Sequence, residues 1–514
     1  MKIHHLLSVF LGGLFAGLLA EADQPNVVLF FLDDMGYGDS RVYNPKSTIE
    51  MPHLETLAAN GMVFTDGHST TAVCAPSRYS VLTGNYPWRG RSTLGTWGFN
   101  EPPQILDGQQ TLGNLMQDAG YQTAIFGKLH LGGLYPRKGS TNDWIVGTDT
   151  QTSHGREMEW KKIDFSQRFR MGPLDWGFDY SYVLPSGIQH EPYAFFENDK
   201  LVDNPGRLVL WPQGASGKDT WFSHEGFGSP DWKTSDAGPK LTGKAVAFIE
   251  RSGDQPFFIH FCSQSLHEPW YPPQKFRGKK IRGQTVSWQT DMLLEFDQTL
   301  GAVMDALDRQ GQLSNTLFII TSDNGGWPFP DTVNKGHNPN EGLRGRKGDA
   351  WEAGHRVPFV VAWGGGEHPE LPIVKGGRSS QLVGIQDIYA TLAELLGVPV
   401  RDGQALDSIS FLAAICGESS SRRTMLMQGG DLHDFRRCVR EDNWKLMVTS
   451  TGEPEMLFDL EVDLMETNNL IHQPEQHERV RRMLQIYRES QAPPIYLDSL
   501  IREKVRPAGG DRFQ

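Results

Sequence analysis

A five-residue motif combines a possible nucleophile with the start of a helix. It runs from Cys74 to Arg78 and reads CAPSR. A cysteine taken at random is usually a small buried hydrophobe, but C-x-P-S-R arises by chance in a chain of this length only about once in a thousand, from average residue usage. The stretch 76–82 predicts the first turns of a helix with Pro76 near its start. The free amides and positive dipole end of that helix would face Cys74 and attract an anion.

Two pairs of oxygen-bearing side chains come directly after apolar runs. Asp33 and Asp34 follow one run, and Asp323 and Asn324 follow another. Taken alone, either pair is typical of a solvated turn or a helix cap. Together they form an all-oxygen set that suits a hard ion such as Ca²⁺ or Mg²⁺.

Five basic side chains stand in short motifs along the chain. The candidates are Arg78, Lys128, His130, His267 and Lys347. A single lysine or arginine is nearly always a surface residue, and a single histidine is more often packed or solvated. A basic group beside an anion tends to keep its proton, so such residues could bind an anion and protonate a leaving group.

The elements that must position these residues alternate along the chain. Apolar runs predict buried strands at 26–32, 256–262 and 316–321, and helical patterns occupy 52–60, 111–119, 240–251, 287–309 and 387–396. This alternation predicts an α/β fold with a mostly parallel central sheet flanked by helices. Ligands of such folds gather outside the carboxyl ends of the strands, which is where the candidate acids lie.

The composition changes near residues 417–421, after which short strands are predicted at 444–448 and 456–460. We therefore expect a catalytic α/β domain over 23–420 and a smaller C-terminal α+β subdomain with a short antiparallel sheet over 421–514. The segments 91–110 and 200–236 lack periodicity and are predicted to be long loops of the functional kind.

The chain has 514 residues and a formal net charge of -13. An acidic chain of this kind argues against nucleic acid or an anionic membrane as the main partner. Residues 1–22 read as a signal peptide, with an apolar run too short to span a membrane and a small-residue cleavage region. We expect a secreted or periplasmic protein without stable membrane insertion. Of four cysteines, Cys416 and Cys438 could form a disulfide or remain free thiols.

With these motifs in view, the sequence resembles the formylglycine-dependent sulfatases, which belong to the alkaline phosphatase superfamily. The resemblance covers nearly all of the chain after its first 22 residues. It implies that a formylglycine-generating enzyme oxidises Cys74 to formylglycine, and that one hydroxyl of the hydrated aldehyde attacks the sulfur of a sulfate ester. Asn85 departs from the family pattern, because many members have a basic residue after Leu-Thr-Gly.

The same resemblance implies a role for each candidate. The metal ligands, for calcium in preference to magnesium, would be Asp33, Asp34, Cys74, Asp323 and Asn324. Arg78 and Lys128 would hold the formylglycine and the charges of the metal site. His130 would take a proton from the second hydroxyl, and His267 and Lys347 would contact the sulfate and protonate the leaving oxygen. Lys128 and His190 complete the expected substrate contacts, and the flat rings of Trp97, Trp327 and Trp351 could stack on a sugar or aryl ring.

The expected activity is hydrolysis of sulfate monoesters, with a sulfated carbohydrate as the leading substrate class. Two alternatives stay open. One is a phosphodiester or phosphonate ester hydrolase of the same superfamily. The other is a non-catalytic protein that binds sulfated glycans, in which Cys74 stays a thiol.

Overall fold

The structure is a computed structural model of the 514-residue chain. It describes residues 24–491 except 96, 100, 141–143, 146–160, 203–208, 212–225, 369–370, 420–421 and 430–434. The proposed signal peptide at 1–22 therefore lies outside the described residues. No described helix is long and apolar enough to cross a membrane.

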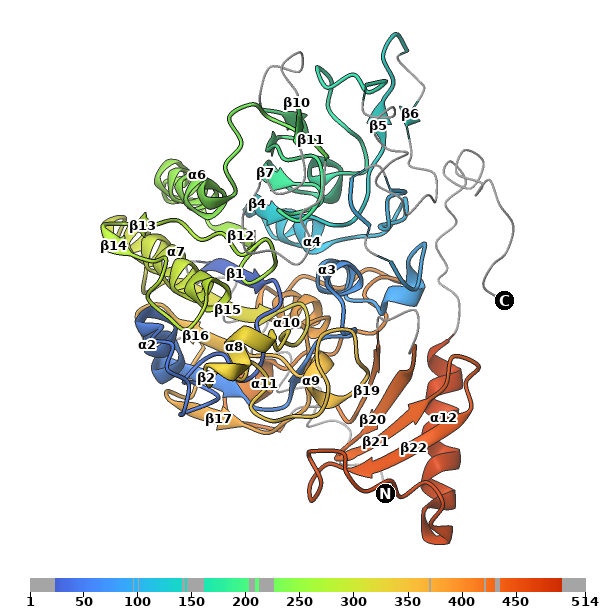
Figure 1. Ribbon diagram of the computed structural model, residues 1–514. Coiled ribbons are helices and arrows are strands. Elements are labelled where there is room, and N and C mark those ends of the chain that lie inside the picture. Colours follow the sequence, from blue (N-terminus) through green and yellow to red (C-terminus); the bar gives the residue numbers. More distant parts are fainter. Residues whose placement is uncertain are drawn as a thin grey trace.

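The largest sheet among the described residues has ten strands and a parallel centre (Figure 1). From edge to edge its strands are β17 (Gly377–Ser379), β2 (Gly61–Phe64), β16 (Phe359–Trp363), β15 (Thr316–Ser322), β1 (Asn26–Leu32), β12 (Phe257–Cys262), β4 (Gln122–Lys128), β7 (Tyr180–Leu184), β8 (Phe196–Glu197) and β9 (Lys200–Leu201). The run β15-β1-β12-β4-β7 is parallel throughout, whereas β16 and β8 pair antiparallel with their neighbours. The α/β fold expected from the sequence is confirmed.

Helices cover both faces of this sheet, as the fully buried pattern of β1 requires. Because successive strand residues point to opposite faces, Val28 and Phe30 pack in one core and Val27 and Leu29 in another. The first core includes α2 (Pro52–Asn60), α6 (Ala237–Ser252) and α7 (Trp288–Arg309). The second includes α3 (Cys74–Thr83), α4 (Leu112–Asp118) and α10 (Asp387–Leu395).

A separate four-stranded antiparallel sheet follows, with one long helix across it (Figure 1). It consists of β19 (Thr424–Gln428), β20 (Arg437–Glu441), β21 (Trp444–Val448) and β22 (Pro454–Asp459), and the helix is α12 (His477–Ser490). Met483 and Leu484 of α12 pack on Val439 and Leu446 of the sheet. This is the small C-terminal subdomain expected from the sequence. The boundary at 420/421 falls on residues outside the described part and stays a prediction.

Shorter strands and α-helices lie between these elements. They are β3 (Gly67–His68), β5 (Tyr135–Pro136), β6 (Trp144–Ile145), β10 (Val209–Trp211), β11 (Gly226–Gly228), β13 (Lys275–Phe276), β14 (Lys279–Lys280), β18 (Val383–Gly384), α8 (Pro330–Asn334), α9 (Glu352–His355) and α11 (Leu412–Ile415). The pairing of β10 with β11 corrects the expectation of loop throughout 200–236. All four cysteines are free, so Cys416 and Cys438 form no disulfide.

Candidate active site

The candidate acids and cations meet at one edge of the parallel sheet. Asp33 and Asp34 follow β1, Lys128 is the last residue of β4, and Asp323 and Asn324 follow β15. These strands run in the same direction, so their carboxyl ends lie at the same edge. The structure thus joins residues that are up to about 290 positions apart in sequence, as the strand pattern predicted.

Cys74 is the first residue of α3, two positions before the helix start expected from Pro76. Its neighbour Val73 is the extended N-cap residue, and the helix ends at Gly84, whose φ of 68° is left-handed and favours glycine. The Cys74 thiol is 2% exposed and lies 3.4 Å from His130 Nδ1. Burial raises the pKa of this thiol, although Lys128 partly opposes the rise. An unmodified Cys74 is therefore a weak nucleophile at neutral pH.

Each acid of the site already faces a cation. Lys128 Nζ lies 2.7 Å from Asp33 Oδ2, Arg78 Nη2 lies 2.6 Å from Asp323 Oδ2, and Lys347 Nζ lies 2.6 Å from Asp34 Oδ1. The cations of these three pairs come from α3, from β4 and from the loop before α9. The acids are three of the candidate metal ligands. The six residues of these pairs, all candidates from the sequence, meet within one cluster.

The surroundings shift the pKa values of Asp33 and Asp323 in opposite directions. Burial alone would raise the pKa of Asp33, but Lys128 and the other nearby cations hold it well below its ordinary value. Burial and the neighbouring Asp33 raise the pKa of Asp323 to about 7. The cluster thus combines one firmly ionised carboxylate with one that can still take up a proton.

Two oxygens in this cluster are suited to a metal ion. Asp33 Oδ1 and Asn324 Oδ1 are buried and accept no hydrogen bond. Their neighbours Asp33, Cys74 and Asp323 present ligand atoms within 4.8 Å of one another, as do Asp33, Asp34 and His267. Hard oxygen donors with unused lone pairs are what Ca²⁺ and Mg²⁺ require. The residues present therefore fit a divalent cation.

Two site residues adopt left-handed backbone conformations that are unusual for non-glycine residues. Asp34 has φ 67° and His130 has φ 59°. Asp34 N donates to Asp323 Oδ1 at 3.1 Å, and His130 N donates to the Pro185 carbonyl at 2.9 Å. Such conformations persist only where surrounding contacts impose them, and they are concentrated at functional sites.

The two histidines are neutral in these surroundings. Burial, reinforced by Lys128, holds the pKa of His130 well below its ordinary value. Burial and the nearby Lys347 lower the pKa of His267 to about 4. His267 Nδ1 lies 2.7 Å from the Glu268 carbonyl, to which it donates, so its Nε2 keeps a lone pair.

The candidate substrate-pocket residues occupy different environments. His190 is half-buried and is close enough to His130 to lower the pKa of His130 further. Trp97 is 5% exposed, and Trp327 carries the Arg346 guanidinium 4.2 Å from its ring centre. Trp351 packs edge-on against Phe458 of β22 and beneath a guanidinium. Those contacts account for Trp351 as a packing residue.

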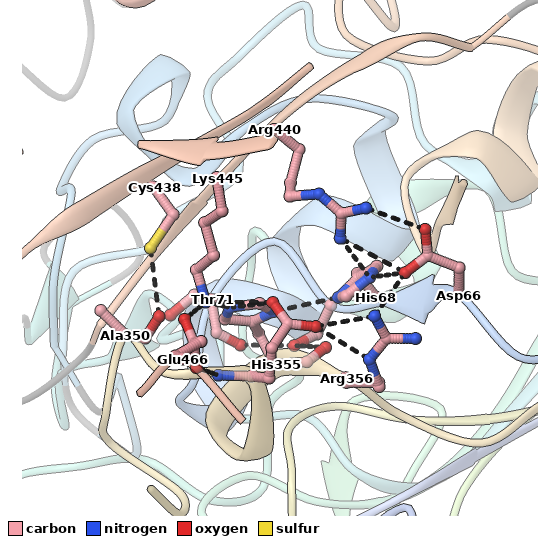
Figure 2. A network of polar contacts seen from close by, with 12 residues as sticks. Asp66, His68, Thr71, Ala350, His355, Arg356, Cys438, Arg440, Lys445 and Glu466 are labelled. Atoms are coloured by element: carbon pink, nitrogen blue, oxygen red, sulfur yellow. Dashed lines mark hydrogen bonds and ion pairs between the residues drawn. The ribbon is translucent and has the colours of Figure 1, made fainter. Parts of the chain in front are cut away.

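Sequence reasoning missed a buried cluster of charged residues and histidines that includes part of the segment before Cys74 (Figure 2). It includes His68 and His355, whose rings are in contact, together with carboxylates and cations from the C-terminal sheet. No local motif marks the cluster, because the contacts that join its parts, such as His68 with His355 and Arg440 with Asp66, span 287 and 374 positions.

Comparison with known proteins identifies the family. The sulfatase family model matches residues 25–398. The chain belongs to the sulfatase family. It is accordingly a hydrolase of sulfate esters, and the Cys74 motif with the acids at the sheet edge lies within the matched region.

Individual sulfatases resemble the chain along most of its length. An N-acetylgalactosamine-6-O-sulfatase of Bacteroides thetaiotaomicron is 30% identical over 523 residues, which cover 91% of this chain and 93% of the relative. Human arylsulfatase A is 28% identical over 489 residues, covering 88% and 84%. A solved sulfatase structure concerned with the metabolism of multiple glycosaminoglycans by B. thetaiotaomicron superposes with a TM-score of 0.75 at 29% identity, over 91% of this chain and all of the other.

Proposed function

We propose that this sulfatase removes 6-O-sulfate from N-acetylgalactosamine residues of sulfated glycans. Its similarity to the N-acetylgalactosamine-6-O-sulfatase, over 91% of the chain, supports this substrate class. The observation that carries the reaction type is the cluster in which buried Cys74 at a helix start adjoins paired acids and cations. Such a site can neutralise the charge of a sulfate ester while a nucleophile attacks it.

The proposed nucleophile is formylglycine formed from Cys74 by a formylglycine-generating enzyme. The hydrated aldehyde would supply the attacking hydroxyl. His130, which lies 3.4 Å from the Cys74 sulfur and is held neutral by burial, is the group to accept a proton from that residue. Arg78 and Lys128 would hold the position of residue 74 and balance the acids next to it.

His267 and Lys347 are the proposed partners of the sulfate and of the leaving oxygen. Lys347 is the one with a proton to donate, because Nε2 of neutral His267 has a lone pair. Lys347 stays protonated, because Asp34 raises its pKa despite burial. Its ammonium can donate to a sulfate oxygen or to the departing alkoxide, as can Lys128 to the sulfate. His190 stands next to His130 and is proposed to contact the sugar.

The proposed metal is calcium, held by Asp33, Asp34, residue 74, Asp323 and Asn324. When bound, a divalent cation polarises the sulfate and the hydroxyl of residue 74. The unused oxygens of Asp33 and Asn324 support this ligand set. We also propose export to the periplasm or the exterior by the signal peptide at 1–22.

A direct test uses chain produced together with a formylglycine-generating enzyme. Mass spectrometry of the peptide that spans Cys74 should show the aldehyde, and ion chromatography should show sulfate release from N-acetylgalactosamine 6-sulfate well above that from the 4-sulfate. The Cys74→Ala variant should lose on the order of a thousandfold or more in kcat. Cys416→Ala, at the end of α11, is the matched control and should keep normal activity.

Other results would overturn the proposal in distinct ways. Faster cleavage of matched phosphate or phosphonate esters would indicate the phosphoryl alternative. An unmodified Cys74 with tight binding of sulfated glycans and no turnover would indicate a binding protein. Preference for the 4-sulfate would reject the proposed sugar position alone.

A further inference from the structure

The buried cluster that includes part of the segment before Cys74 joins three parts of the chain (Figure 2). Its members are almost fully buried and are Asp66, His68, Glu352, His355, Arg356, Arg440, Lys445 and Glu466. Asp66 and His68 lie on the segment that leads to Cys74, and Glu352 and His355 form the ends of α9, which follows the Lys347 loop. Arg440 and Lys445 come from β20 and β21 of the C-terminal sheet. We call these eight residues the buried charge cluster.

The charges of the buried charge cluster balance when its histidines are neutral. Lys445 Nζ lies 3.0 Å from Glu352 Oε1 and 2.7 Å from Glu466 Oε1. Arg440 Nη2 lies 3.0 Å from Asp66 Oδ2. Arg356 Nη2 lies 2.7 Å from Asp66 Oδ1 and 2.8 Å from Glu352 Oε2, so it bridges the two carboxylates.

Three carboxylates therefore face three permanent cations. Ligand atoms of Asp66, His68 and Glu352 lie close enough together for a metal ion. The charge of these acids is already neutralised by the cations, however, so a metal would add an uncompensated buried charge. The cluster is a set of fixed charges rather than a metal site.

The hydrogen bonds dictate which nitrogen of each histidine carries the proton. An ammonium can only donate, so His355 Nε2 accepts from Lys445 Nζ at 3.0 Å. The proton of neutral His355 is then on Nδ1, which donates to His68 Nδ1 at 3.0 Å. His68 Nε2 lies 2.7 Å from Asp66 Oδ1, a carboxylate oxygen that can only accept, and 3.3 Å from Arg440 Nη1, which can only donate. The contact with Asp66 is the shorter one, and Arg440 Nη1 also has Asp66 Oδ1 as an acceptor at 3.3 Å, so we place the His68 proton on Nε2. The chain Lys445-His355-His68-Asp66 has one consistent direction.

The surroundings of both rings favour this neutral arrangement. Burial lowers the pKa of His68, although Asp66 partly opposes the change. Burial and the adjacent Lys445 hold the pKa of His355 well below its ordinary value. A second proton on His68 would place an N–H against the N–H of His355, and the contact between the rings would be lost.

Backbone hydrogen bonds connect α9 and the residue after His68 to the segments that carry the candidate site residues. Ser69 N, next to His68, donates to the His355 carbonyl at 2.8 Å. Gly348 N, next to Lys347, donates to the Ala72 carbonyl at 2.8 Å, two residues before Cys74. Gly325 N, next to the ligand Asn324, donates to the Gly354 carbonyl at 2.9 Å. The helix α9 is thus hydrogen-bonded both to the segment before Cys74 and to the chain just after Asp323 and Asn324.

We propose that the buried charge cluster is a positioning unit of the sulfatase. In it the His68–His355 contact fixes the Cys74 segment relative to the Lys347 loop and to the acids at the sheet edge. None of its members touches the reacting atoms. Its effect is on geometry, so loss of the ring contact should lower kcat and leave KM nearly unchanged. This inference rests on the proposed sulfatase chemistry of Cys74.

Two substitutions of one residue separate positioning from folding. In His355→Asn the side-chain amide nitrogen can take the place of Nδ1 and still donate to His68. In His355→Gln the amide oxygen can take the place of Nε2 and accept from Lys445, but the donor to His68 is lost. We expect His355→Asn to retain at least a third of the wild-type kcat and His355→Gln to lose at least tenfold, with KM within twofold of wild type in both.

The reciprocal pair at His68 provides a second measurement. His68→Asn keeps an acceptor for His355, whereas His68→Gln keeps only the donor to Asp66, so the Asn variant should again be the more active. All rates are taken per aldehyde-containing chain, below the temperature at which circular dichroism shows unfolding. Equal kcat values for Asn and Gln at both positions, or an effect confined to KM, would overturn the inference. Wild-type chain with the aldehyde but without sulfate release would instead reject the proposed function.

Discussion

At the scale of single residues, the active site combines paired charges with buried oxygens that accept no hydrogen bond. The Asp33 carboxylate receives Lys128 on one oxygen, while its other oxygen accepts no hydrogen bond. The amide nitrogen of Asn324 donates to Asp34 at 2.9 Å, and its oxygen accepts nothing. Arg78 Nη2 lies 3.4 Å from Asp33 Oδ1, an ion-pair contact without a hydrogen bond. Buried acceptors without a hydrogen bond destabilise a fold, so both oxygens favour a bound cation as an additional partner.

We therefore expect chelation of divalent cations to abolish sulfate release. Prolonged treatment with EDTA should reduce the rate to background, and added Ca²⁺ should restore it better than Mg²⁺, because a site of five clustered ligands suits the larger ion. Asp34→Asn should weaken Ca²⁺ binding by tenfold or more in isothermal titration calorimetry. Asp231→Asn, an exposed acid, is the control. Undiminished activity in EDTA would contradict the metal site.

The sequence predicted those site residues that carry a local signal. Asp33 and Asp323 were found because each follows an apolar strand, and Cys74 because its motif is rare. His68 and His355 were not found, because a histidine pair formed across 287 positions has no local signature. A single lysine is nearly always a surface residue, and only the tertiary fold buries Lys445 against Glu352 and Glu466.

At the scale of elements, α7 supports the loop that carries His267. Glu295 of α7 is 3% exposed, and Gln264 Nε2 in that loop donates to it at 3.3 Å. The first turn of α6 approaches so closely that a Cβ at Gly238 would lie 1.8 Å from Glu295 Oε1. Burial raises the pKa of Glu295 to about 8.

This buried acid should make the stability of the protein depend on pH. Between about pH 4.5 and pH 8 the unfolded chain has released the Glu295 proton while the folded chain keeps it, so stability falls as pH rises. Glu295→Gln removes this loss. From pH 5 to pH 8 we expect the variant to gain about 3 kcal/mol in free energy of unfolding relative to wild type, at roughly 1.4 kcal/mol per pKa unit.

Urea unfolding at the two pH values measures this difference. Glu394→Gln, an exposed residue of α10, should show no comparable dependence. A constant difference between wild type and Glu295→Gln across the pH range would mean that Glu295 is ionised in the folded protein.

The long elements were predictable and the short ones were not. The strand at 26–32 and the helix at 52–60 have the expected bounds, because continuous burial and a proline start with a following glycine mark them locally. β8 and β9 have two residues each, too few for any periodicity. β16 is antiparallel within a parallel region, an arrangement that depends on its pairing with β15 and β2 rather than on its own residues.

At the scale of the whole molecule, the catalytic part and the C-terminal sheet share buried contacts. Tyr86, which follows α3, packs in the core of the small sheet, and its hydroxyl accepts from Leu426 N at 3.0 Å. β19 is also hydrogen-bonded to the segment before Cys74, because Ala72 N donates to the Gln428 carbonyl at 2.9 Å. We propose that the predicted units 23–420 and 421–514 unfold together.

Lys445→Met tests this coupling. The substitution leaves Glu352 and Glu466 buried without their ammonium, which should lower the free energy of unfolding by about 3–5 kcal/mol. Hydrogen exchange followed by mass spectrometry should show faster opening in β1 and β12 as well as in β20 and β21. Lys279→Met, on exposed β14, should change stability by less than about 0.5 kcal/mol. Faster exchange confined to the C-terminal sheet would contradict joint unfolding.

Because the Cys74 segment contacts residues far downstream in the sequence, it can reach its final position only late in synthesis of the chain. A ribosome must add more than 350 residues after Cys74 before Gln428, Arg440 and Lys445 exist to hold that segment in place. At about 5–20 residues per second, this interval lasts tens of seconds. We propose that the Cys74 thiol, which the finished fold buries, stays accessible to the proposed formylglycine-generating enzyme during that interval.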